Sequence, residues 1–74
     1  MPVIQVKVIE NVFSQEQKRE MIERLTDAMV EIEGEPLRPF TLVTVEEVAS
    51  GDYGVAGNAL TTEDVKAVQA GAPA

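Results

Sequence analysis

Pro2-Val3-Ile4-Gln5-Val6-Lys7-Val8-Ile9 opens the sequence with apolar residues at every second position. Ile4, Val6 and Val8 share one face, while the other face is half polar. This alternation predicts a β-strand over residues 2–9. Proline suits the first position of a strand, where its missing N–H removes no ladder hydrogen bond. Because the second face still carries Val3 and Ile9, we expect both faces of the sheet to be covered.

A helix is predicted directly after this strand. Ser14 and Gln17 have the spacing of a capping box, in which each side chain accepts from the other residue's backbone N–H. Gly34 and the nearby Pro36 are typical of a helix end. One apolar stripe is predicted along the helix, formed by Met21, Ile22, Leu25, Ala28, Met29 and Ile32.

A second strand is predicted over residues 40–45, which are rich in β-branched and aromatic side chains. Strand, helix and strand make a β-α-β unit of the α/β class with parallel strands. One helix covers only one face of so small a sheet, so we expect partner chains to bury the other face in an oligomeric sheet assembly. This places the amino terminus near a subunit boundary.

The remaining residues predict smaller elements. Residues 50–54 form a turn rich in glycine, and residues 55–60 favour a C-terminal hairpin at the sheet edge. Thr61 or Thr62 is the expected start of a second helix, and residues 71–74 are expected to be disordered. We therefore divide the chain into a domain over residues 1–60 and a C-terminal extension over residues 61–74.

Composition excludes several classes of function. The chain has 74 residues, a net charge of −7, and neither cysteine nor histidine. Its six basic residues form no contiguous patch, so we expect neither nucleic acid nor an anionic membrane as partner. No stretch approaches the about 18 apolar residues of a spanning helix, and no secretory leader pattern opens the chain, which predicts a cytoplasmic protein. Without histidine, a serine triad is excluded, and we expect no metal site.

Pro2 is the candidate catalytic residue. If methionine aminopeptidase removes Met1, Pro2 carries a secondary amine on a rigid strand. A free α-amino group has a pKa near ~8, and an apolar pocket lowers that pKa further, into the range useful for proton transfer at neutral pH. If Met1 remains, the nitrogen of Pro2 is a tertiary amide without a basic lone pair.

Residues 2–57 resemble the 4-oxalocrotonate tautomerase family, the small β-α-β members of the tautomerase superfamily. The resemblance implies hexamers built as trimers of dimers. It also implies an amino-terminal proline that transfers protons without metal or cofactor, and enol or keto acids as substrates. The residues that carry it are Pro2, Ile4-Gln5-Val6, Glu10, Gln15-Glu16-Gln17-Lys18, Pro36-Leu37, Glu47, Ala49 and Gly51-Asp52-Tyr53-Gly54-Val55-x-Gly57.

The sequence departs from the family at two arginines that bind substrate carboxylates. The first position falls at or beside Val12, and the second on Leu42 or Thr41. Tyr53 keeps an aromatic residue of the hairpin. Arg38 is the nearby guanidinium that would substitute for the missing cations, although a solvated loop cation is the plainer interpretation. By resemblance, the predicted substrate-binding residues are Arg38, Tyr53, Leu42 and Val12, around the catalytic Pro2.

The resulting prediction is a cofactor-independent tautomerase that moves a proton on an enol or keto acid, an isomerase. Because the arginines are missing, we expect weak or altered activity on dicarboxylates and a preference for monoacid or aromatic enols. Two alternatives are a partner subunit of a hetero-oligomer and a non-catalytic scaffold. A third is a hydratase or dehalogenase that acts on an unsaturated acid and activates water with Glu46, Glu47 or Asp52.

Overall fold

The computed structural model describes residues 1–71. These residues form two compact units, which are described separately. The first unit contains residues 1–6 and 14–46, and the second contains residues 7–13 and 47–71. Apart from Gly71, the tail that the sequence predicts to be disordered lies outside the described residues. No helix within residues 1–71 is long and apolar enough to cross a membrane.

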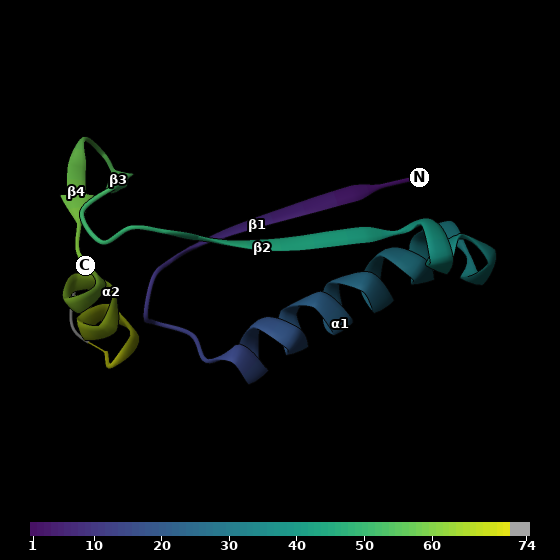
Figure 1. Cartoon of the computed structure of the whole chain (residues 1–74), viewed down its shortest axis with the longest axis horizontal. Coiled ribbons are helices and arrows are strands. Elements are labelled where there is room, and N and C mark those ends of the chain that lie inside the picture. Colours follow the sequence, from purple (N-terminus) through teal and green to yellow (C-terminus); the bar gives the residue numbers. More distant parts are fainter. Residues whose placement is uncertain (72–74) are drawn as a thin grey trace. The chain divides into compact units, whose positions relative to one another are not determined.

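The described elements confirm the predicted β-α-β order. Strands β1 and β2 form a two-stranded sheet (Figure 1). Where the two strands begin, the N–H of Leu42 donates to the Pro2 carbonyl at 3.1 Å. Where they end, the N–H of Glu10 donates to the Val48 carbonyl at 2.8 Å. The first residues of β1 therefore lie beside the first residues of β2, so the strands are parallel. The elements are β1 (Val3–Ile9), α1 (Gln15–Glu33), the 3-10 helix η1 (Glu35–Phe40), β2 (Leu42–Val48), β3 (Tyr53–Val55), β4 (Asn58–Leu60) and α2 (Thr62–Gln69).

Both ends of α1 lie where the sequence predicts them. The hydroxyl of Ser14 accepts from the Gln17 N–H at 3.1 Å, and the Gln17 side chain accepts from the Ser14 N–H at 2.8 Å. At the other end, Gly34 has a φ of 103° and donates its N–H to Val30 at 2.8 Å. A side chain at this φ is strained, which explains why glycine ends the helix.

The predicted apolar stripe on α1 is partly wrong. Val30, which the stripe omitted, is buried, whereas Ile32 is 83% exposed and Ile22 is 38% exposed. The covered side of the helix is rotated toward Val30 and Glu33, because the chain after Gly34 folds back as η1 and packs against α1. This return path is not encoded in the spacing of the helix's own residues.

The second strand begins and ends later than predicted. Phe40 belongs to η1, and the N–H of Thr41 closes that helix by donating to Arg38 at 3.2 Å. Strand β2 therefore starts at Leu42 and continues to Val48. Pro36 lies in the first turn of η1. Backbone N–H groups in the first turn of a helix have no acceptor within the helix, so the absence of an N–H in proline breaks no hydrogen bond there.

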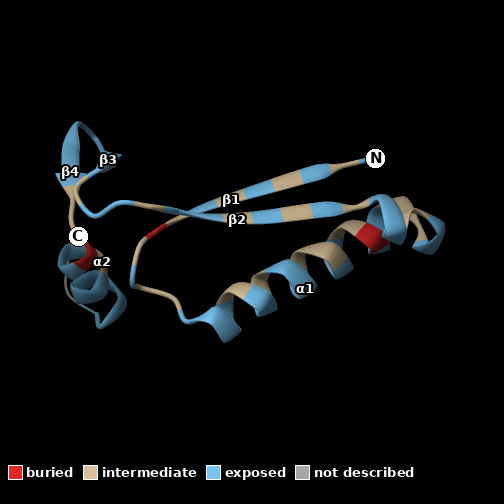
Figure 2. Cartoon of the chain, in the orientation of Figure 1, coloured by how far each residue is buried: buried red, intermediate tan, exposed pale blue. Residues whose placement is uncertain are grey.

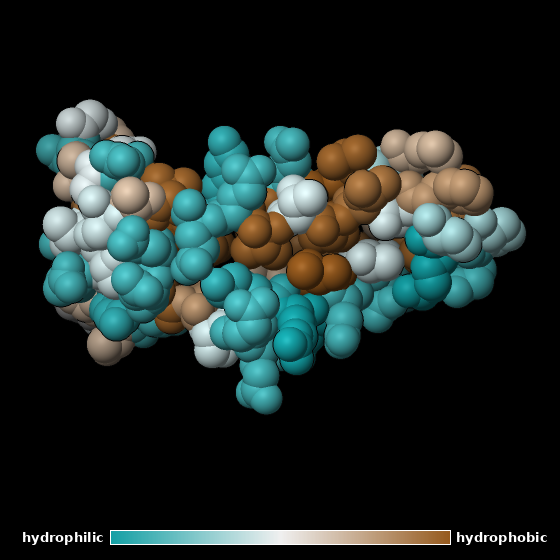
Figure 3. Space-filling view, in the orientation of Figure 1, coloured by the Kyte–Doolittle hydropathy of each residue, from teal (hydrophilic) through white to brown (hydrophobic). Residues whose placement is uncertain are grey.

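One face of the first unit remains open. Alternate residues Ile4, Val6, Val43 and Val45 are half-buried, while Val3 and Leu42, on the other side of the strands, are exposed. Helix α1 runs along one side of the two strands (Figure 1). Apolar side chains gather along these strands in Figure 3. Within residues 1–71, Ile9 and Val30 are the only buried apolar side chains (Figure 2). Such a core is small for a domain of this length.

The second unit contains the predicted hairpin and helix. Strands β3 and β4 pair antiparallel, with Tyr53 opposite Leu60, but they form a sheet of their own instead of extending the edge of β1 and β2. Helix α2 starts after Thr61, whose hydroxyl accepts from the Asp64 N–H at 3.2 Å, which selects Thr61 over Thr62 as the cap. The neighbouring Thr62 is buried and donates its hydroxyl to the Glu10 carbonyl at 2.7 Å.

Replacing Ala56 by asparagine is expected to stabilise the protein by about 1 kcal/mol, because left-handed backbone disfavours alanine by roughly that amount. Ala56 and Gly57 connect β3 to β4 with φ values of 51° and 83°, the geometry in which asparagine followed by glycine is preferred. Urea unfolding of the variant measures the gain. The same substitution at Ala59, in β4 of the same hairpin, serves as control and should bring none.

Candidate active site

Pro2 lies immediately before β1 and is half-buried. Its carbonyl accepts the N–H of Leu42 at 3.1 Å. Because proline has no N–H, this carbonyl is the only backbone hydrogen-bonding group that Pro2 contributes to the ladder. Met1, which precedes it, is 82% exposed. Removal of Met1 would therefore disturb no buried contact.

Leu42 and Thr41 occupy different sides of the strand beside Pro2. The bond between Leu42 and Pro2 places Val3 next to Leu42 where the parallel ladder begins. Val3 is 60% exposed and Leu42 is 54% exposed. Thr41 is half-buried, and its hydroxyl donates to the Leu37 carbonyl at 3.0 Å. Of the two positions that sequence comparison left open, Leu42 is thus the one on the open face.

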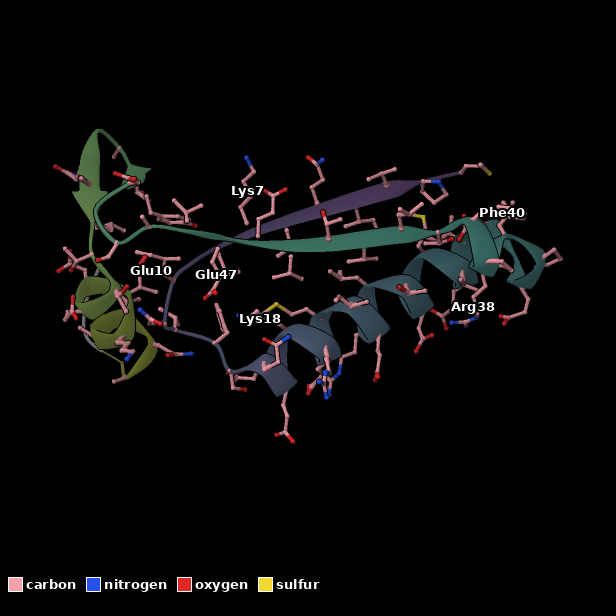
Figure 4. The ribbon with its side chains drawn as sticks, viewed as in Figure 1. Lys7, Glu10, Lys18, Arg38, Phe40 and Glu47 are labelled. Carbon is pink, nitrogen blue, oxygen red and sulfur yellow. The ribbon has the colours of Figure 1, made fainter. Side chains whose placement is uncertain are left out.

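Arg38 is paired with carboxylates of its own unit. Its Nε donates to Glu35 at 2.7 Å, and a terminal nitrogen donates to Asp27 of α1 at 2.9 Å. Hydrogen bonds to Glu35 and then to Asp27 raise the pKa of Arg38 above its usual value. In Figure 4 its side chain lies on the α1 side of η1. A substrate carboxylate would compete with both acidic partners for this guanidinium.

Val12 and Tyr53 belong to the second unit, whereas Pro2, Arg38 and Leu42 belong to the first. Tyr53 opens β3 and is half-buried. Val12 is half-buried in the bend that follows β1. Of the predicted site residues, the structure brings Pro2 and Leu42 into direct contact through their backbones.

The candidate water-activating carboxylates also have defined positions. Glu46 is exposed on β2, and Asp52 is exposed before β3. Glu47 accepts the N–H of Asn11 at 3.3 Å and so supports the turn after β1, where Asn11 has a φ of 61°. Lys7 and Glu47 extend to opposite sides of the ladder (Figure 4). The contact of Glu47 with Asn11 gives it a structural role in the second unit.

Sequence reasoning missed a polar contact that lies beside Pro2. Thr41, which precedes Leu42, also donates its hydroxyl to the carboxylate of Glu33, the last residue of α1. The two residues are eight positions apart and meet because η1 turns the chain back. No local spacing rule predicts such a contact, since capping and helix-pair rules extend over three or four residues.

Comparison with known proteins identifies relatives across most of the chain. Residues 2–63 match the family model of the tautomerase enzymes. Probable tautomerase BH3814 of Halalkalibacterium halodurans is 39% identical over 64 residues, which are 85% of this chain and 100% of that protein.

Solved structures agree with this match. A structure from work on 4-oxalocrotonate tautomerase isozymes of Methylibium petroleiphilum superposes with a TM-score of 0.70 at 31% identity, covering 86% of this chain and 97% of that one. DmpI from Helicobacter pylori superposes with a TM-score of 0.71 at 30% identity, covering 80% and 95%. By fold, by sequence and by the resemblance carried on Pro2 and the hairpin, the chain belongs to the 4-oxalocrotonate tautomerase family.

Proposed function

We propose that this protein is a cofactor-independent tautomerase in which the amino group of Pro2, freed by removal of Met1, moves a proton on an enol acid. Family membership supports a tautomerase-like function. The observation that carries the assignment of Pro2 is its position. It is half-buried immediately before β1, its carbonyl is held by the Leu42 N–H at 3.1 Å, and it follows the exposed Met1.

The proposed reaction transfers one proton from oxygen to carbon. The neutral amine of Pro2 takes the proton of the enol hydroxyl, the electron pair left on oxygen forms the C=O bond, and the C=C electrons take a proton from the ammonium to form a C–H bond. The O–H bond is broken and a C–H bond is formed, with no net change in electrons. Charge that develops on the enolate oxygen requires a donor. We propose the hydroxyl of Tyr53 or the guanidinium of Arg38 for this role.

The substrate proposed here is an enol with one carboxylate or an aromatic group. The residue beside Pro2 on the open face is Leu42, next to Val3, and both are apolar and more than half exposed. An apolar surface binds the hydrocarbon part of a substrate but offers no donor to a second carboxylate. Val12, the other position where the family has an arginine, is equally without a donor.

Replacing Leu42 by arginine is expected to improve binding of a dicarboxylate enol. A hydrogen bond between charged groups contributes about 1.5–3 kcal/mol, which corresponds to a KM lower by tenfold or more. Steady-state kinetics on matched mono- and dicarboxylate enols measure the change. Thr41→Arg is the positional control: it removes the half-buried hydroxyl contacts and should lower stability without this gain. Equal KM ratios in Leu42→Arg and wild type would exclude Leu42 as a substrate neighbour.

The same observations leave one alternative. If another chain supplies the missing arginines, this protein is the partner subunit of a hetero-oligomer. The pairing of Arg38 with Glu35 and Asp27 favours that possibility. Assay of the purified chain alone separates the two, because a partner subunit is inactive until the second chain is added.

We further propose a homo-oligomer, a hexamer as the family resemblance implies, in the cytoplasm. Support comes from the open apolar surface of the first unit and from the small number of buried apolar side chains within residues 1–71. Native mass measurement of the purified protein tests the number of chains.

A further inference from the structure

The hydroxyl of Thr41 ties the end of α1 to the start of β2. It carries one hydrogen and has two acceptors within reach, the Leu37 carbonyl at 3.0 Å and a carboxylate oxygen of Glu33. Glu33 is the last residue of α1, and Thr41 immediately precedes β2. This contact, which we call the Glu33–Thr41 brace, therefore fixes the chain direction at the point where β2 begins.

Stability alone does not explain an acidic residue at this position. The second carboxylate oxygen of Glu33, Oε1, is buried, and no donor among residues 1–71 reaches it. A buried polar atom without a partner is unfavourable for folding. A glutamate at position 33 is therefore unfavourable if the side chain only fills space. We infer that its contact with Thr41 orders the residues that follow Thr41.

The residue beyond Thr41 is Leu42, whose N–H holds the carbonyl of Pro2 at 3.1 Å. This bond joins Pro2 to the ladder through its carbonyl, so the direction of its ring depends on where the Leu42 N–H lies. We propose that Glu33 and Thr41 are positioning residues that set the orientation of the Pro2 nitrogen through Leu42. This inference rests on the proposed catalytic role of Pro2.

Thr41→Val tests the brace, because valine keeps the shape of threonine and removes the hydroxyl. We expect kcat to fall about tenfold with KM within about twofold of wild type, since substrate contacts remain while the base is misdirected. We also expect hydrogen exchange of the Leu42 amide to quicken about tenfold. The reference is the Lys18 amide, which donates to Ser14 at 3.0 Å at the other end of α1.

Conservative variants distinguish positioning from simple packing. Thr41→Ser and Glu33→Gln keep a hydroxyl and an acceptor oxygen, so both should retain at least about half of kcat. Glu33→Met keeps the length of the side chain without an acceptor and should behave like Thr41→Val. Urea unfolding confirms that each variant is folded. If Thr41→Val does not fold, Glu33→Met carries the same comparison, because it leaves the bond from Thr41 to Leu37 intact.

Two outcomes overturn the inference. One is an unchanged Leu42 exchange rate in Thr41→Val and Glu33→Met, which would show that the brace does not hold Pro2. The other is faster exchange with unchanged kcat. If wild type shows no activity that depends on Pro2, the proposed function fails by itself, and the Leu42 exchange rate alone decides whether the brace orders the Pro2 end of the sheet.

Discussion

Replacing Pro2 by alanine is expected to lower kcat/KM for ketonisation of an enol acid by about a hundredfold, the lower end of what a positioned acid or base contributes. Alanine also permits removal of Met1, so the variant keeps a free amine of similar basicity. What it loses is the ring, which prevents rotation about the N–Cα bond and holds the nitrogen in one direction. The measurement is a spectrophotometric assay of enol loss, with mass spectrometry to confirm that Met1 is absent from both proteins.

Two controls make the Pro2 result specific. Pro39→Ala removes another proline of the first unit, at an exposed position in η1, and should leave kcat/KM within about twofold. Acetylation of the wild-type amino terminus removes the basic lone pair and should abolish activity. An unchanged rate in Pro2→Ala, with Met1 shown to be absent, would contradict the proposed role of Pro2.

The pH dependence gives the direction of proton transfer. A base must be neutral to accept a proton, so kcat/KM should rise as pH increases through the pKa of the Pro2 amine. A free α-amino group has a pKa near ~8, and burial in an apolar site disfavours its charged form and lowers that pKa. A rate that falls over the same range instead means that the protonated amine acts as the acid, as the hydratase or dehalogenase alternative requires.

Replacing Val3 by aspartate is expected to dissociate the oligomer and to lower the melting temperature by about 10 °C or more. Val3 is apolar and 60% exposed on the open face of the first unit. If a second chain covers it, the substitution removes about 1.5 kcal/mol or more of apolar burial and places a charge in the interface. For a domain of this size, each kcal/mol shifts the melting temperature by about 4–8 °C.

Sedimentation velocity and thermal melts at two protein concentrations measure this effect. The melting temperature of wild type should rise with concentration, because association stabilises the folded chain by mass action. Gln15→Asp is the matched control: it adds the same charge in the exposed first turn of α1, where negative charge is favourable. A monomeric wild type with a melting temperature independent of concentration would exclude the proposed assembly.

Elements that depend on neighbouring residues could be predicted from the sequence. The capping box of Ser14 and the end of α1 at Gly34 involve hydrogen bonds over three or four residues. The strand alternation of residues 2–9 is equally local and is confirmed over Val3–Ile9. Elements that depend on the path of the chain were placed less well. Strand β2 begins at Leu42 because η1 takes up Phe40, and Ile32 is exposed because η1 packs on another side of α1.

The amino-acid sequence by itself determined the order of elements, the strand that follows Pro2 and the family resemblance, because these follow from periodicity, capping and the identity of single residues. Only the tertiary structure decided the contacts of the predicted site residues and of their neighbours. It turned Leu42 to the open face and Thr41 toward Glu33, and it paired Arg38 with Asp27, eleven positions away. Such contacts arise when η1 reverses the chain, and no rule that extends over one helical turn contains that reversal.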